Sequence, residues 1–111
     1  MFGLRRRPAV ATLTPIEVRD LLAGEAITLV DVREDGEWAR ERIGGAVHRP
    51  LSRLRETAKD LPQDKPVVFH CLAGSRSAQA VALCRSMGLP HERHMGGGLS
   101  AWKAQGLPVT P

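Results

Sequence analysis

Residues 66–77 read Pro-Val-Val-Phe-His-Cys-Leu-Ala-Gly-Ser-Arg-Ser. The apolar, β-branched run over 66–70 predicts a strand that is buried on both faces of a sheet. A wide apolar stripe then predicts a helix over residues 75–87, which Gly88 ends. In open α/β sheets, ligands bind where such a strand gives way to a helix. The loop between 70 and 75 is therefore the first place to look for chemistry.

Segments of the same two kinds alternate along the rest of the chain. The clearest helix start is the capping box Thr14-Pro15-Ile16-Glu17, with Gly24 at the helix end. This alternation predicts one α/β domain, with a parallel sheet that helices cover on both faces. Beyond 66–70, strands are predicted at 27–32, 46–48 and 91–95, and helices at 15–23, 34–42, 52–61 and around Trp102.

The composition is that of an ordinary globular domain. With 111 residues the chain has room for one domain, which we expect over residues 9–111, after a basic tail at 1–8 that contains Arg5-Arg6-Arg7. A membrane span needs about 20 apolar residues, and neither such a run nor an export signal is evident, so we expect a cytoplasmic protein. The net charge of +4 favours small anions, and we expect no nucleic-acid partner.

Cys71 stands at the end of the strand predicted at 66–70, where its sulfur is favoured as an anion. Backbone N–H groups of the loop can converge on the sulfur, Gly74 permits a positive φ, and the helix N-terminus adds partial positive charge. Cysteines at helix N-termini have lowered pKa values, so we expect Cys71 to be a nucleophile. Arg76 supplies a fork of donors for an oxyanion. The alternative is an ordinary buried cysteine at a strand end.

Two reaction classes use a cysteine in such a loop, and the size of the loop separates them. A tyrosine phosphatase loop has five residues between cysteine and arginine, which makes room for a tetrahedral phosphate. Here four residues intervene, Leu72, Ala73, Gly74 and Ser75. The tighter loop favours transfer of a single sulfur atom over phosphate chemistry.

Other titratable residues have more ordinary interpretations. Asp31 and Arg33 share a face at the end of the strand predicted at 27–32, and either brace the cysteine loop or form a generic salt bridge. Cys84 lies about 13 Å along the helix from its start, too far for a disulfide to Cys71, and is expected in the core. His70 is expected to be structural. His91 and His94 are three apart on a strand, so no metal site is expected, nor any cofactor.

Four motifs in order resemble the rhodanese family over most of the chain. They are Leu29-Val30-Asp31-Val32-Arg33, Glu37-Trp38 with Ile43-Gly44-Gly45-Ala46, Cys71-Leu72-Ala73-Gly74-Ser75-Arg76-Ser77, and Gly97-Gly98-Leu99-Ser100-Ala101-Trp102. The resemblance implies a rhodanese-like fold, a three-layer α/β/α sandwich with a five-stranded parallel sheet in the order 1-5-4-2-3. One departure is Glu41-Arg42-Ile43-Gly44, where the family usually has a histidine and a proline.

The resemblance also implies a reaction. Cys71 would take the outer sulfur of a small anionic donor such as thiosulfate and pass the sulfur to cyanide, a thiol or a dithiol protein. The N–H groups of residues 72–76 would stabilise the persulfide, Arg76 would bind the oxyanion, and Asp31, Arg33 and Ser77 would support the loop. A persulfide carrier that binds a partner protein would have the same site, and arsenate or phosphate-ester chemistry is the third alternative.

Overall fold

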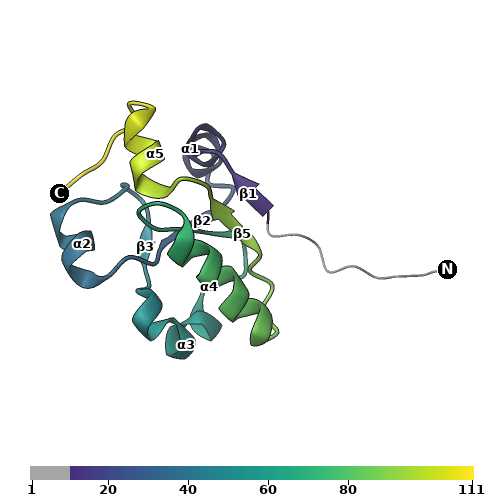
Figure 1. Cartoon of the computed structure of the whole chain (residues 1–111). Coiled ribbons are helices and arrows are strands. Elements are labelled where there is room, and N and C mark those ends of the chain that lie inside the picture. The colour runs from purple at the N-terminus through teal and green to yellow at the C-terminus, as the bar shows by residue number, and fades with distance from the viewer. Residues whose placement is uncertain (1–10) are drawn as a thin grey trace.

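The computed structural model describes residues 11–111 as a three-layer α/β/α sandwich (Figure 1). Five parallel strands form one sheet in the order β1-β5-β4-β2-β3. This order and the fold class confirm the prediction. The strands are β1 (Ala11–Leu13), β2 (Thr28–Asp31), β3 (Val47–His48), β4 (Val67–His70) and β5 (Arg93–Met95). The α-helices are α1 (Pro15–Ala23), α2 (Asp35–Arg40), α3 (Leu54–Thr57), α4 (Ser75–Ser86) and α5 (Gly98–Ala104).

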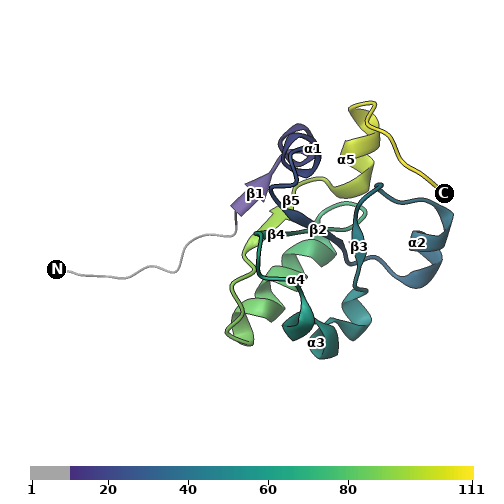
Figure 2. The same cartoon turned by 180° about the vertical axis from the view of Figure 1, so that it is seen from behind.

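The central strands are buried on both faces, as their continuous apolar runs predict. Alternate residues point to opposite faces of a strand, so Val67 and Phe69 of β4 enter one core while Val68 enters the other. The first core packs under α3 and α4, and the second under α1 and α5 (Figures 1 and 2). Two separate cores, one on each face of the sheet, therefore hold the central strands in place.

The local signals at α1 are confirmed in detail. Thr14 Oγ1 accepts from the N–H of Glu17, and the Glu17 carboxylate accepts from the N–H of Thr14. Gly24 is the C-cap residue, as expected. No helix within residues 11–111 combines the length and the apolar character that crossing a membrane requires.

Two elements differ from the expectations, and one expectation goes untested. The sequence pattern does not reveal β1, because three residues are too few to show a strand period. The helix expected over 52–61 is one α-helical turn, α3, between two 3₁₀ segments, Leu51–Arg53 and Ala58–Asp60. The tail at 1–8, with Arg5-Arg6-Arg7, and the domain start at residue 9 lie outside the described residues.

Candidate active site

Cys71 lies directly after β4, in a loop of four residues that leads into α4. The loop turns back on itself at Gly74, whose φ of 116° is open to glycine but strained for other residues. Cys71 is only 1% exposed, which fits the alternative of a buried cysteine. The direction of the surrounding N–H groups argues against that alternative.

The sulfur of Cys71 is the focus of several hydrogen bonds. The N–H of Gly74 donates to Sγ over 3.1 Å and the N–H of Ser77 over 3.3 Å. Burial alone would raise the pKa of Cys71, but hydrogen bonds from the Ser77 hydroxyl and from the N–H groups of Ser77, Gly74 and Ala73 together bring it below its ordinary value of 9.0. The loop therefore favours a thiolate, the form in which a cysteine is nucleophilic.

Ser77, on the first turn of α4, connects the sulfur to a histidine. Cys71 Sγ lies 3.6 Å from Ser77 Oγ and can donate to it only as a thiol, whereas a thiolate accepts from the Ser77 hydroxyl. Ser77 Oγ in turn lies 2.8 Å from His94 Nδ1. His94 comes from β5, and sequence reasoning gave it no role. Only the order of the sheet, which places β5 beside β4, brings His94 to the cysteine loop.

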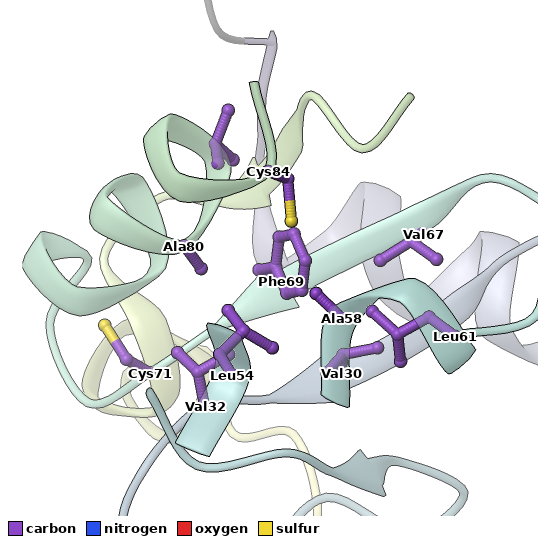
Figure 3. Close-up of a cluster of buried hydrophobic side chains, with 11 residues drawn as sticks. Val30, Val32, Leu54, Ala58, Leu61, Val67, Phe69, Cys71, Ala80 and Cys84 are labelled. Carbon is purple, nitrogen blue, oxygen red and sulfur yellow. The ribbon is translucent and has the colours of Figure 1, made fainter. Parts of the chain in front are cut away.

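The second cysteine, Cys84, differs from Cys71 in its surroundings. Cys84 is fully buried in the core beside Phe69 (Figure 3), as expected. Burial raises the pKa of Cys84 to about 11, and no hydrogen bond opposes that rise. Both cysteines are unbridged. Cys84 is therefore a thiol at neutral pH and serves as a matched control for Cys71.

Arg76 follows Ser75 on α4 and is held by an acidic residue that sequence reasoning missed. Its guanidinium donates to both carboxylate oxygens of Glu37 on α2, over 2.6 and 2.9 Å. The bond from Arg76 lowers the pKa of Glu37 to about 2, although burial opposes the shift. Glu37 occupies two of the five N–H donors of Arg76, and the binding of an oxyanion by the other three stays a prediction.

Asp31 and Arg33 form the pair that their spacing predicts, at the end of β2. Both are buried, and Arg33 Nε lies 3.1 and 3.0 Å from the two carboxylate oxygens of Asp31. Arg33 also donates to the Glu41 carbonyl at the end of α2, over 2.7 Å. The pair thereby anchors α2, which carries Glu37. Any bracing of the cysteine loop by this pair is indirect, through α2 or through His70, because within residues 11–111 no hydrogen bond or ion pair joins either side chain to the loop itself.

His70 precedes Cys71 but faces away from the sulfur. Its Nδ1 lies 3.3 Å from the Cys71 carbonyl, and its Nε2 lies 3.5 Å from Asp31 Oδ2. Burial lowers the pKa of His70, with Asp31 opposing the shift. Its surroundings agree with the structural role that we expected.

The backbone of the loop also rests on α5. The N–H groups of Leu99 and Ser100 donate to the carbonyls of Cys71 and Leu72, over 2.8 and 2.9 Å. Gly98 permits this approach, because a Cβ there would lie 2.5 Å from the Cys71 carbonyl oxygen. Leu72 is 44% exposed, so the rim of the site carries one apolar side chain.

Other features of the described chain lie away from this loop. A groove of about 840 Å³ includes Ile27, Thr28 and Val47, at the amino ends of β2 and β3, the opposite edge of the sheet from Cys71. Its lining includes no residue of the 71–77 loop. Within residues 11–111 no three His, Cys, Asp or Glu side chains gather as metal ligands would.

A cysteine cradled by amide groups at the end of a central strand of a 1-5-4-2-3 sheet defines the rhodanese class of α/β domain. The family model for the Rhodanese-like domain matches residues 14–105. The chain belongs to the rhodanese-like domain family.

Several curated relatives carry sulfurtransferase names, among them proteins of Mycobacterium tuberculosis and Allochromatium vinosum. The chain is 40% identical over 101 residues to the probable adenylyltransferase/sulfurtransferase MoeZ of Mycobacterium tuberculosis, covering 88% of this chain. It spans about a quarter of that relative's length, 26%. It is 34% identical over 86 residues to a sulfurtransferase of Allochromatium vinosum, covering 78% of this chain and 80% of that protein.

The fold is also similar to a solved structure. A rhodanese-related protein from Thermoplasma volcanium superimposes with a TM-score of 0.80 and 32% sequence identity. The match covers 90% of this chain and 97% of the other. The similarity thus extends over nearly the whole of both chains.

Proposed function

We propose that the protein is a thiosulfate sulfurtransferase that works by double displacement through Cys71. The thiolate attacks the outer sulfur of thiosulfate, the S–S bond breaks, and sulfite leaves with the bonding electron pair. An acceptor thiolate or cyanide then attacks the outer sulfur of the persulfide, and Cys71 leaves as a thiolate. The observation that carries the proposal is the convergence of N–H groups on Cys71 Sγ.

The residues of the loop have distinct parts in this proposal. N–H groups of residues 72–76 stabilise the anionic outer sulfur, because preorganised dipoles act strongly where little water is present. Arg76 keeps three N–H donors besides the two that Glu37 occupies, and these bind the sulfonate oxygens of the donor. The reaction needs a reduced cysteine, which is the normal state of thiols in the cytoplasm, where we propose that the protein acts.

The test compares the two cysteines. After treatment with thiosulfate, mass spectrometry should find one added sulfur atom on Cys71 and none on Cys84. Cys71→Ser should lower thiosulfate:cyanide turnover by roughly 10³-fold or more, because the nucleophile is gone. Cys84→Ser, which removes the thiol with the raised pKa, should retain turnover. Turnover of an aryl phosphate or arsenate without a persulfide would instead favour the phosphatase-like alternative.

One observation favours a second candidate, a persulfide carrier. The relative MoeZ, whose name joins two activities, is about four times longer than the matched segment. A carrier of this kind would receive sulfur from, or deliver it to, a thiol or dithiol protein. Such a carrier should be charged much faster by a protein donor than by free thiosulfate, whereas the proposed enzyme should use thiosulfate itself.

A further inference from the structure

Ser77 is the meeting point of several groups that compete for one hydrogen. Its Oγ lies 3.6 Å from Cys71 Sγ, 2.8 Å from His94 Nδ1 and 3.1 Å from the Gly74 carbonyl oxygen. A serine hydroxyl has a single hydrogen to donate and two lone pairs that accept. Ser77 can therefore stabilise a Cys71 thiolate only when its hydrogen is not given to another acceptor.

Of the two competing acceptors, the Gly74 carbonyl has another donor. The N–H of Ala78 donates to that carbonyl oxygen over 3.2 Å, as the first bond of α4. That carbonyl oxygen has a second lone pair and stays a competitor. The other neighbour, His94 Nδ1, can act in either sense, because it accepts a hydrogen when it is unprotonated and donates one when it is protonated. The other ring nitrogen, Nε2, lies 3.4 Å from Thr12 Oγ1 on β1.

We propose that His94 is a positioning residue for the Cys71 thiolate and acts through Ser77. With a hydrogen on Nδ1, His94 donates to Ser77 Oγ, and the Ser77 hydroxyl hydrogen points at Cys71 Sγ. Without that hydrogen, Ser77 donates to His94 and the thiolate loses one hydrogen bond. The Thr12 hydroxyl favours the first arrangement when it donates to Nε2, because it then leaves the hydrogen of a neutral imidazole on Nδ1.

The surroundings of His94 leave Ser77 and Thr12 as its polar partners in the described chain. His94 is 9% exposed and sits on β5 between β1 and β4. Burial lowers its pKa, with no charged neighbour among the causes. The charged and titratable groups of the neighbouring elements are paired with other residues or exposed. Arg76 of α4 binds Glu37, and His70 of β4 contacts Asp31. In the segment around the start of β5, Glu92 binds Arg85 and Arg93 is exposed.

The role of His94 in catalysis rests on the proposed sulfur transfer, but its effect on Cys71 can be measured without that reaction. The probe is iodoacetamide, and the readout is the pH profile of Cys71 alkylation, resolved from Cys84 by mass spectrometry. In His94→Phe no ring N–H donates to Ser77 Oγ, so the Ser77 hydroxyl can turn to the Gly74 carbonyl oxygen 3.1 Å away. The midpoint should then move upward by about 0.5 to 1 pH unit, which lowers the thiolate fraction below the midpoint by roughly 3- to 10-fold. His94→Asn, whose amide N–H can still donate to Ser77, should recover part of the shift.

Three further variants make the test specific. Ser77→Ala should raise the midpoint, and His94→Phe should add nothing in that background, because the effect of His94 passes through Ser77. His91→Phe is the matched control, since His91 is also buried but contacts Phe69 and has no bond to Ser77. Its profile should match that of the wild type.

The wild-type protein offers a measurement that does not depend on whether any variant folds. The NMR shifts of the His94 ring should show a step at the Cys71 midpoint. Any one of three results would overturn the inference. These are an alkylation profile that His94→Phe leaves unchanged, additive midpoint shifts in the double variant, and a wild-type His94 signal that does not change when Cys71 ionises. If alkylation depends on His94 while thiosulfate leaves no sulfur on Cys71, the proposed function fails and this inference stands.

Discussion

At the scale of single residues, the site is built from charges that are paired before any ligand arrives. Arg76 would be a mobile cation without Glu37, and two hydrogen bonds to one carboxylate fix the plane of its guanidinium. The remaining donors then face a fixed direction, which lowers the entropy cost of binding an oxyanion. Sequence reasoning found Arg76 from its spacing to Cys71. It found Glu37 only as part of a motif and not as the partner of Arg76, because the two are 39 residues apart in the sequence.

Glu37→Gln tests this pair by its pH dependence. The pKa of Glu37 falls from 4.5 to about 2 in the folded protein, chiefly through Arg76, so the carboxylate stabilises the fold at pH values above 4.5. That contribution is lost as the pH drops through about 2. In urea titrations at neutral pH the variant should be less stable by about 1 kcal/mol, and the difference should shrink in acid.

The control for Glu37→Gln is Glu56→Gln, on an exposed position of α3. This change should leave the free energy of unfolding nearly unaltered at both pH values. A deficit in Glu37→Gln that is as large in acid as at neutral pH would contradict the role of the charged pair.

At the scale of elements, the position of the cysteine loop depends on α5. In the sequence, the glycines at the start of α5 indicate only a turn. Their function becomes clear in the structure, where the N-terminus of α5 donates to the Cys71 and Leu72 carbonyls. Gly98 has a φ of 57° and leaves no room for a Cβ. A contact between segments so far apart along the chain has no signature in local periodicity, which is why the sequence predicted α5 but not its docking.

Gly98→Ala should therefore damage both stability and reactivity. Gly88→Ala is the matched control, because Gly88 has a similar φ of 71° but open space where a Cβ would lie, with nothing within 4 Å. The control should cost about 1 kcal/mol from the left-handed backbone alone. Gly98→Ala should cost about 1 to 3 kcal/mol more in urea titrations and should slow Cys71 alkylation. Equal losses in the two variants would contradict the close approach.

At the scale of the whole molecule, a buried ion pair joins the sheet to the helix beside the site. Asp31 at the end of β2 binds Arg33, and Arg33 reaches the Glu41 carbonyl at the end of α2. The helical layers were predictable from buried strands and helix caps, which are local in the sequence, and the strand order followed from the family resemblance that the four motifs carry. The contacts by which side chains of α2, α4 and β5 meet at one loop were not predictable, since a strand order does not say which side chains touch.

Asp31→Asn should destabilise the whole domain rather than one loop. The change leaves the buried charge of Arg33 uncompensated, which typically costs about 3 to 5 kcal/mol. Asp20→Asn, which breaks an exposed pair with Arg19, should cost less than about 1 kcal/mol. Equilibrium unfolding in urea measures both, and a loss in Asp31→Asn no larger than that in Asp20→Asn would contradict the anchoring of α2.

The most direct measurement of the central claim is the ionisation of Cys71 itself. The ultraviolet absorbance of the thiolate is followed against pH for the wild type and for Cys71→Ser, and the difference gives the pKa of Cys71 alone. We predict a pKa below the ordinary 9.0, because the amide groups and Ser77 outweigh burial. A value at or above 9.0 would show that Cys71 is held as a thiol like Cys84, and would contradict the account.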